Sequence, residues 1–173
     1  MSLQQRLMQS IKDYENFPIQ GITFKDINPI LRDPELFNEL LNVMAQSPLL
    51  TKSDAIIAVD ARGFIFGACI ANKLKKPLVL ARKPGKLPGQ LIEENYDLEY
   101  GSNGLSIQCE ALAKYKKFVI VDDLLATGGT VESIYKILNS NKKIVLGLLV
   151  LIELIKLEGR KRLSFEVDSI LKL

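Results

Sequence analysis

The clearest chemical signal in this sequence is the stretch VIVDDLLATGGTV, residues 119–131, where an apolar run leads into two acids and a Thr-Gly-Gly-Thr turn. Gly128 and Gly129 allow backbone N–H groups to approach a ligand closely. The hydroxyls of Thr127 and Thr130 add further donors. The helix that we expect to follow presents the positive end of its dipole to the same place. Together these features predict a binding site for a phosphate group.

Two adjacent acids precede this turn. Ionised Asp122 and Asp123 only accept hydrogen bonds, so they suit the donating hydroxyls of a vicinal ribose diol or the water shell of Mg²⁺. The turn has no lysine and the chain has no G-x-G-x-x-G stretch, which argues against a nucleoside-triphosphate P-loop and a dinucleotide fingerprint. The alternative is that the acids are caps and the glycines form only a tight turn. The complete string favours a site that binds a sugar and its phosphate together.

Short apolar runs alternate with helical patterns along most of the remaining sequence. Strands are predicted at residues 55–59, 77–81, 118–121 and 144–152 from continuous apolar runs, at 165–170 from alternation, and at 98–100 and 105–107 from shorter signals. The alternation of strands and helices predicts an α/β fold with a parallel, doubly wound sheet. We expect the strand at 118–121 to end at Asp122. Ligands of such sheets bind at the carboxyl ends of the strands, where this acid falls.

Helices are predicted where apolar residues recur three and four positions apart. Asp33 is expected to cap a helix over residues 34–46. The apolar stripe over 131–138 indicates a helix packed on the sheet directly after the Thr-Gly-Gly-Thr turn, residues 127–130, which we call the phosphate turn. Two further helices are predicted at residues 64–74 and around 110–113.

Two segments lack any period. Residues 17–33 contain proline and glycine and are predicted to be irregular structure that covers something, and residues 82–97 are predicted to be a mobile surface loop. We therefore expect an N-terminal hood or flap, residues 1–33, over the base site and an α/β core, residues 34–173. Overall these parts form a single structural domain.

Composition narrows the possible functions. The chain has 173 residues, of which 47% are hydrophobic and 25% charged, and a net charge of +3, values that fit an ordinary globular protein. Its lysines and arginines are dispersed, so no basic stripe indicates a nucleic-acid binder. The absence of histidine excludes imidazole-based catalysis and histidine metal sites. Cys69 and Cys109 lack metal-ligand or redox spacing, and we expect them to be free thiols.

No segment predicts attachment to a membrane. The first residues lack the apolar region of a secretory signal, and the longest apolar run, 144–152, is about half of the ~20 residues that a membrane-spanning helix needs. A cytoplasmic protein is therefore expected.

Five stretches resemble motifs of the adenine-specific branch of the type I phosphoribosyltransferases, and the matches span roughly residues 17–135. In chain order they are FKDINPIL (24–31), ARGFIFG (61–67), RKPGKLP (82–88), YDLEYG (96–101) and VIVDDLLATGGTV (119–131). The resemblance implies that family's fold, a central parallel sheet flanked by helices with a small N-terminal hood.

The resemblance also implies a role for most of the residues in these motifs. The 5′-phosphate and ribose would be bound by Asp122, Asp123, Ala126, Thr127, Gly128, Gly129 and Thr130. Pyrophosphate would be bound by Asp60, Ala61, Arg62, Gly63, Arg82, Lys83 and Lys86, with a strained non-proline peptide bond often found in the first of these two segments. Adenine would be bound by Thr23, Phe24 and Lys25 of the hood.

Several of these residues also have a chemical argument of their own. A guanidinium at Arg62 can grip phosphate oxygens with two donors, and a cation at a helix start opposes the dipole, which favours a functional role in catalysis over a surface role. The loop cations after residue 81 can neutralise a departing pyrophosphate, although for Lys86 an ordinary solvated loop is an equal alternative. Lys25 stands where the family most often has arginine, and lysine lacks the planar fork for stacking or bidentate contacts.

Glu99 is the acid that the resemblance places near N7 of the purine, next to Tyr100 of the same loop. Because the chain has no histidine, a carboxylate is a natural partner for the proton that moves during catalysis. The alternative is a solvent-facing residue on a short strand.

The implied reaction joins adenine to the phosphoribosyl group of phosphoribosyl pyrophosphate, gives AMP and pyrophosphate, and uses Mg²⁺ held mainly through substrate and water. A homodimer is implied, and neither nucleic acid nor a membrane is expected as a partner. Two alternatives stay open, a 6-oxopurine phosphoribosyltransferase and a non-catalytic regulator that senses phosphoribosyl pyrophosphate. The residues from Glu153 onward carry little motif content, and we expect them to serve structure and not function.

Overall fold

The computed structural model describes residues 1–98 and 101–173, with the backbone alone described for 95–98 and 101–103. The chain divides into two compact units, Met1–Val43 and Met44–Leu173, and each is described here by itself.

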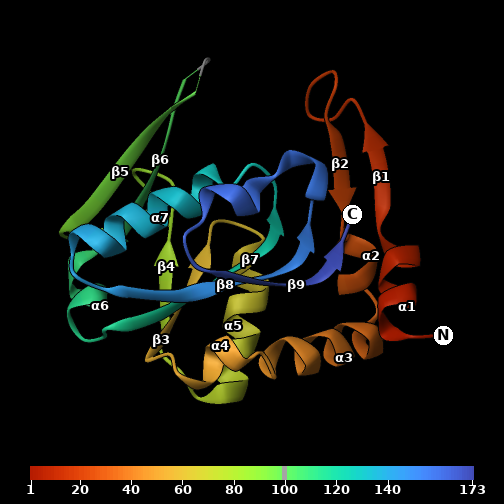
Figure 1. Cartoon of the computed structure of the whole chain (residues 1–173), viewed down its shortest axis with the longest axis horizontal. Coiled ribbons are helices and arrows are strands. Elements are labelled where there is room, and N and C mark those ends of the chain that lie inside the picture. The colour runs from red at the N-terminus through yellow and green to blue at the C-terminus, as the bar shows by residue number, and fades with distance from the viewer. Residues whose placement is uncertain (99–100) are drawn as a thin grey trace. The chain divides into compact units, whose positions relative to one another are not determined.

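A five-stranded sheet is the centre of the unit Met44–Leu173 (Figure 1). Its strands are β3 (Ala55–Val59), β4 (Leu78–Ala81), β7 (Lys117–Leu125), β8 (Ile144–Glu153) and β9 (Glu166–Lys172). They lie in the order β4-β3-β7-β8-β9, and all neighbours pair in parallel. The predicted parallel α/β sheet is therefore confirmed, and the strand predicted from alternation is β9, at one edge of the sheet.

Helices cover both faces of this sheet. Ile57 of β3 and Ile120 of β7 belong to one apolar core together with Ile134 of α7 (Gly129–Ser140). The side chain of Ala58 points the other way, because neighbouring residues of a strand alternate between faces. It meets α5 (Gly63–Leu74), where a Cβ added at Gly67 would lie 2.5 Å from the Ala58 Cβ. Figure 1 shows the two helices on opposite sides of the sheet.

The order of the strands creates a switch point between β3 and β7. From β3 the chain passes through α5 to β4 on one side, whereas from β7 it passes through α7 to β8 on the other side. The segments that leave the carboxyl ends of these two central strands therefore diverge. In open α/β sheets such a divergence leaves a crevice that is the usual ligand site.

The carboxyl end of β7 differs from the sequence prediction. We expected the strand to end at Asp122, but it continues to Leu125, and Leu125 pairs with Glu153 of β8. β8 is long enough to pair with β7 as far as Leu125, so the backbone of β7 stays hydrogen-bonded even where its side chains are acidic. Both acids therefore stand on a paired, rigid strand.

A separate sheet of two strands follows β4. β5 (Leu91–Leu98) pairs antiparallel with β6 (Gly101–Gln108), so the prediction of a loop over residues 82–97 is wrong from Leu91 onward. These strands are mostly polar, and their partner across the ladder, not an apolar period, specifies them. The predicted strand at 105–107 lies within β6. The predicted strand at 98–100 begins in β5, and its other residues lie outside the described part of the chain.

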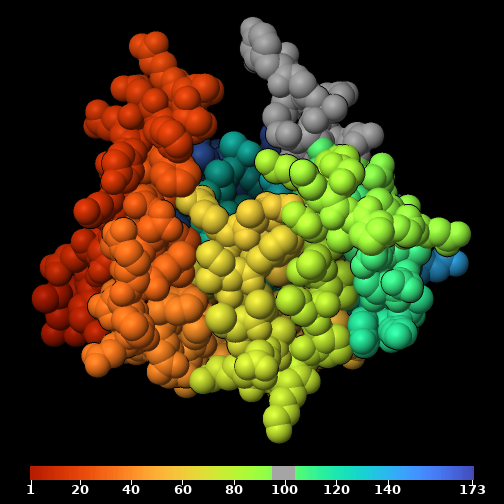
Figure 2. All heavy atoms as spheres, turned by 180° about the vertical axis from the view of Figure 1, so that it is seen from behind, coloured from red at the N-terminus to blue at the C-terminus, as the bar shows by residue number. Residues whose placement is uncertain are grey.

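Short helices complete this unit. The helix expected near 110–113 is confirmed as α6 (Cys109–Ala113), and four-residue α4 (Pro48–Thr51) was not predicted. After β8 come two 3-10 turns, η1 (Ile155–Leu157) and η2 (Gly159–Arg162). Seen from behind, α5 and the segment after β4 form much of the surface, coloured yellow to light green in Figure 2.

The unit Met1–Val43 contains α1 (Leu3–Ser10), β1 (Lys12–Glu15), β2 (Thr23–Asp26), α2 (Asn28–Leu31) and most of α3 (Pro34–Ala45). The prediction of irregular structure over 17–33 is wrong for β2 and α2. β2 forms because its backbone pairs with β1, a partner that the sequence did not reveal. The capping prediction is confirmed, since the Leu36 N–H donates to Asp33 Oδ1 at 3.0 Å.

Candidate functional site at the switch point of the sheet

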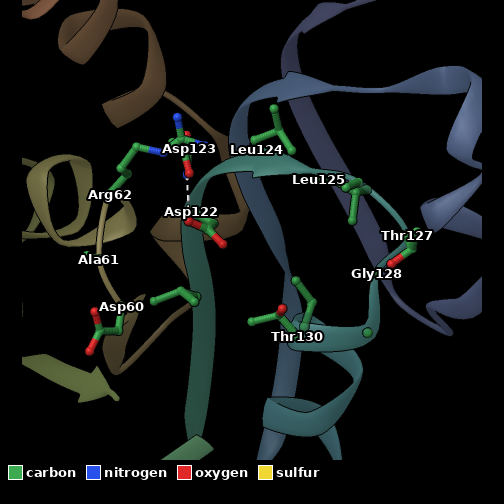
Figure 3. Close-up of a pocket in the computed structure, with 14 residues that line it drawn as sticks. Asp60, Ala61, Arg62, Asp122, Asp123, Leu124, Leu125, Thr127, Gly128 and Thr130 are labelled. Carbon is green, nitrogen blue, oxygen red and sulfur yellow. Dashed lines mark hydrogen bonds and ion pairs between the residues drawn. The ribbon is translucent and has the colours of Figure 1, made fainter. Parts of the chain in front are cut away.

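A cavity of about 400 Å³ lies at the carboxyl ends of β3 and β7. Two segments line it, residues 59–62 and residues 122–131, and Figure 3 shows them facing each other across the cavity. Ten of the sequence-predicted site residues are therefore brought together here: Asp60, Ala61, Arg62, Asp122, Asp123, Ala126, Thr127, Gly128, Gly129 and Thr130.

The turn between β7 and α7 presents backbone N–H groups to this cavity. Gly128 precedes the helix with φ of +85° and ψ of −3°, a left-handed conformation that glycine adopts at little cost. Gly128, the N-cap residue of this twelve-residue helix, has no side chain with which to cap it, and the start of α7 lies at the cavity. An anion that bound here would meet these donors and the positive end of the helix dipole.

The two acids differ in exposure. Asp123 is buried, with 7% of its side chain exposed, whereas Asp122 is half-buried. Asp123 Oδ2 lies 2.9 Å from Arg62 Nε, so an ion pair joins the two segments that line the cavity. Within the described part of the chain this oxygen nevertheless accepts no hydrogen bond. A buried carboxylate oxygen in that state is ready for a hydroxyl or water donor from a ligand.

Both acids have perturbed acidity. Burial raises the pKa of Asp122 well above its usual value, and the nearby negative charge of Asp123 raises it further. Burial also raises the pKa of Asp123, while the Arg62 guanidinium opposes that shift. Asp122 Oδ1 accepts the Asp123 backbone N–H at 2.8 Å, which orients one carboxylate against the other. A donating or cationic ligand would relieve this concentration of charge.

The turn after β3 brings its backbone close to these acids. The peptide bond between Asp60 and Ala61 is cis, so the unusual non-proline bond implied by the resemblance is present. Gly63 does not line the cavity but permits its shape, because a Cβ at this position would lie 2.8 Å from both Asp122 Oδ1 and the Val121 carbonyl oxygen. Only glycine allows α5 to begin this close to β7.

The three loop cations lie outside the residues that line the cavity. Arg82 contacts residues near the cavity: its Nε donates to Asp60 Oδ2 at 3.1 Å, and its guanidinium lies 5.7 Å from the centre of the Phe64 ring. Lys83 and Lys86 are exposed. Arg82 therefore contacts the cavity through Asp60, and the two lysines lie on the surface of the loop that follows β4.

The predicted adenine residues belong to the unit Met1–Val43, on β2. The Phe24 ring packs edge to face with Phe17, with ring centres 5.3 Å apart, and Lys25 Nζ lies 2.6 Å from Asp13 Oδ2. Glu99 and Tyr100, the predicted catalytic acid and its neighbour in the loop, lie outside the described residues.

One contact of the site was missed in the sequence. The backbone of Gly159, in the stretch expected to serve structure alone, contacts the turn between β7 and α7: a Cβ at Gly128 would lie 2.8 Å from the Gly159 carbonyl oxygen. The isolated glycine in a basic turn was the available signal, but it is uninformative without knowing what the turn touches.

Residues 1–98 and 101–173 offer neither a metal cluster of their own nor a membrane-spanning helix. In this part of the chain, no three acids or cysteines gather into a group that could hold a metal ion by themselves. None of its helices combines the length and apolar character needed to cross a membrane.

Comparison with known proteins relates the chain to a family. Residues 30–172 match the phosphoribosyl transferase domain. An adenine phosphoribosyltransferase of Prochlorococcus marinus (strain MIT 9215) is 52% identical over 170 residues, covering 98% of this chain and 99% of the relative. The enzyme of the same name from Mycoplasmopsis agalactiae (strain NCTC 10123 / CIP 59.7 / PG2) is 45% identical over 169 residues, covering 96% and 98%.

Solved structures give the same picture. The adenine phosphoribosyltransferase of Thermoanaerobacter pseudethanolicus ATCC 33223 superposes with a TM-score of 0.93 at 41% identity, covering 99% of this chain and all of that one. The Saccharomyces cerevisiae enzyme, complexed with an imino-altritol bisphosphate and adenine, gives a TM-score of 0.89 at 34% identity, with 98% of each chain covered.

Proposed function

This chain belongs to the phosphoribosyl transferase family, and from that membership we infer its reaction: it transfers the 5-phosphoribosyl group of phosphoribosyl pyrophosphate to N9 of adenine. The products are AMP and pyrophosphate, so the chain is a pentosyltransferase of purine salvage. The observation that carries this conclusion is the cavity at the strand ends, where the buried Asp123 carboxylate, ion-paired with Arg62, faces the glycine turn that precedes α7. Such a pair of features suits a ribose and its 5′-phosphate.

We propose that the phosphate turn binds the 5′-phosphate through its backbone N–H groups. Ala126 and Thr127 enter the turn, Gly128 and Gly129 expose the amides, and Thr130 adds a hydroxyl in the first turn of α7. Asp122 and Asp123 then accept hydrogen bonds from the two ribose hydroxyls. Since both acids stand on the paired part of β7, their carboxylates approach the sugar from a fixed backbone.

The turn at residues 60–63 is proposed as the pyrophosphate site. Arg62 is well suited to this role because it stands at the junction of both segments, with its Nε beside Asp123. We propose that its guanidinium also reaches phosphate oxygens. Arg82, Lys83 and Lys86 would then approach from the loop and neutralise the departing charge.

In the proposed chemical step, N9 of adenine attacks C1′ while the bond from C1′ to the pyrophosphate oxygen breaks. The bonding electrons leave with pyrophosphate, and C1′ passes through a state with oxocarbenium character. The residues of this chain hold the sugar in line and stabilise the leaving group, which are the two contributions that preorganised sites make most effectively.

The acids are compatible with Mg²⁺ held through substrate and water. The described residues offer no group of three ligands for a metal ion, but the adjacent carboxylates of Asp122 and Asp123 suit the water shell of a hard cation. The ion would supply charge neutralisation to pyrophosphate when bound.

On the base side, the proposed hood, residues 1–33, covers the purine while residues 34–173 form the core. Phe24 would stack on adenine, and Thr23 and Lys25 would supply polar contacts. Glu99 would accept the purine proton near N7 as N9 forms its bond to C1′, and would return it in the reverse reaction. Glu99→Gln is expected to lower kcat by ~10²–10⁴ at saturating substrates, and an unchanged kcat would remove this role. Tyr100 is proposed as a loop neighbour of the site.

The test of the function is a purine panel. Purified protein is incubated with phosphoribosyl pyrophosphate and adenine, hypoxanthine or guanine in turn, with and without Mg²⁺, and nucleotide is separated chromatographically. Formation of AMP from adenine alone is expected, because a site that accepts the adenine amino group rejects the oxo group at the same position. Nucleotide from hypoxanthine, or binding without turnover, would contradict the proposal.

A homodimer in the cytoplasm, as the resemblance implies, stays a prediction. Size-exclusion chromatography with light scattering measures the mass in solution, and a monomer at all concentrations tested would overturn the dimer.

A further inference from the structure

The phosphate turn is in direct backbone contact with η2, a segment more than twenty residues further along the chain. A Cβ placed on Gly159 would lie 2.1 Å from the Ala126 carbonyl oxygen and 3.0 Å from the Gly128 amide nitrogen. In the opposite direction, a Cβ on Gly128 would lie 2.8 Å from the Gly159 carbonyl oxygen. The backbone of Gly159 therefore contacts the backbone of residues 126–128 with no side chain between them.

Gly159 is followed by a residue that is firmly anchored. Arg160 Nε donates to Glu153 Oε1 at 2.8 Å, and its Nη2 donates to Glu153 Oε2 at 2.6 Å. The remaining edge of the guanidinium donates from Nη1 to the Val167 carbonyl at 2.8 Å. The geometry is bidentate, and it ties η2 to the ends of β8 and to β9.

The acid in this pair is buried and its second oxygen is also satisfied. The Glu153 side chain is 8% exposed, and Ser169 Oγ donates to its Oε2 at 2.8 Å. Hydrogen bonds from Arg160 hold the pKa of Glu153 below its usual value despite burial. Glu153 is itself paired with Leu125, the last residue of β7 before the phosphate turn. The anchor and the turn that it supports thus rise from adjacent strand ends.

We propose that Glu153 and Arg160 are positioning residues for the phosphate site: their ion pair presses the Gly159 backbone against residues 126–128 and fixes the direction of the amides that bind the 5′-phosphate. This inference rests on the proposed function. The positioning is indirect, because neither side chain lines the cavity.

The neighbouring residue Lys161 provides a matched control. It lies in the same turn and also forms an ion pair, with Glu158 at 2.5 Å, but its side chain is 74% exposed. Loss of this pair removes a charge from η2 without loosening the anchor. An exposed pair of this kind contributes little to stability.

The experiment compares Arg160→Lys, Glu153→Gln and Lys161→Met with the parent protein. Lysine keeps the charge at position 160 but cannot make the three contacts of the guanidinium, and glutamine keeps the shape at 153 but loses the charge. The dissociation constant for ribose 5-phosphate is measured by titration calorimetry, and KM is measured separately for phosphoribosyl pyrophosphate and for adenine. Thermal unfolding of each variant is recorded in parallel.

We expect both anchor variants to raise the dissociation constant for ribose 5-phosphate and the KM for phosphoribosyl pyrophosphate about tenfold, since a misplacement of about 1 Å can cost up to ~10²-fold. KM for adenine should stay within about twofold, and Lys161→Met should resemble the parent.

Three results would overturn the proposal. The first is an unchanged affinity for ribose 5-phosphate in both anchor variants. The second is a lower fraction of active protein while KM for phosphoribosyl pyrophosphate stays unaltered. The third is failure of both variants to fold, which would assign the pair to overall stability alone. Failure of the proposed function is distinguishable, because it would appear as a parent protein that binds ribose 5-phosphate but makes no AMP.

Discussion

Substitution of Gly128 by alanine tests whether the backbone contact beneath the phosphate turn is real. The left-handed φ of +85° would cost an alanine about 1–2 kcal/mol, partly offset by about 0.4–1 kcal/mol because alanine has fewer unfolded conformations. The new Cβ would also lie 2.8 Å from the Gly159 carbonyl oxygen. The backbone of residue 128 fixes the position of this Cβ, and the oxygen belongs to the Gly159 backbone, so relief requires a shift of the turn. Such overpacking costs about 1–3 kcal/mol. The total loss of unfolding free energy should be about 2–4 kcal/mol.

Gly89→Ala separates the two contributions. Gly89 has the same φ of +85°, but a Cβ there meets no atom within 4 Å. Its replacement should therefore cost only the conformational part, about 1 kcal/mol. Urea unfolding curves of the two variants and the parent give the free energies. Equal destabilisation by both substitutions would refute the contact with Gly159.

The same substitution should impair binding at the phosphate site. Displacement of the amides of residues 127–129 is expected to raise KM for phosphoribosyl pyrophosphate at least about tenfold, because the phosphate depends on their direction. A variant of Gly128 that loses stability and keeps its KM would show that the turn does not bind the phosphate.

The acids give three further predictions. Asp123→Asn should lower kcat/KM for phosphoribosyl pyrophosphate about 10- to 100-fold, since hydrogen bonds to a charged group are worth about 1.5–3 kcal/mol; steady-state kinetics that match the parent would remove Asp123 from the ribose site. Asp122 has a raised pKa in the folded protein, so the parent should lose unfolding free energy as pH rises from the ordinary pKa of an aspartate through the raised one. Asp122→Asn should reduce that loss and leave the smaller part that belongs to Asp123, whose pKa burial also raises. Stability profiles of variant and parent that run parallel between about pH 4 and 8 would contradict the assignment. Glu153, whose pKa is lowered, should act in the opposite direction: its contribution to the unfolding free energy is present above the ordinary glutamate pKa and is lost as the solution is acidified. Glu153→Gln should therefore weaken the fall in unfolding free energy below about pH 5, measured by urea unfolding.

Local patterns were sufficient for much of the fold. The apolar run over 55–59 is β3 with the same bounds, and the stripe over 131–138 lies on the buried face of α7. Both patterns depend only on residues that are close together in the sequence. The polar strands β5 and β2 were missed for the complementary reason. Their partners in the ladder, not their own sequence, make them strands.

For the site, the sequence determined which residue types stand at the ends of the two central strands and that a glycine turn follows the acids. It could not determine the ion pair between Arg62 and Asp123, the need for a glycine at position 63 or the raised pKa of Asp122. Each of these depends on β3 lying next to β7, which is a property of the strand order.

The C-terminal stretch shows the same division most clearly. Local patterns predict strands at residues 144–152 and 165–170, and nothing in the residues from Glu153 onward indicates a ligand. The contact of Gly159 with the turn after β7, and the hydrogen bonds from Arg160 to Glu153, are visible only once the chain is folded. Contacts between backbones that are distant in sequence leave no periodic trace, because they are created when neighbouring strands end side by side.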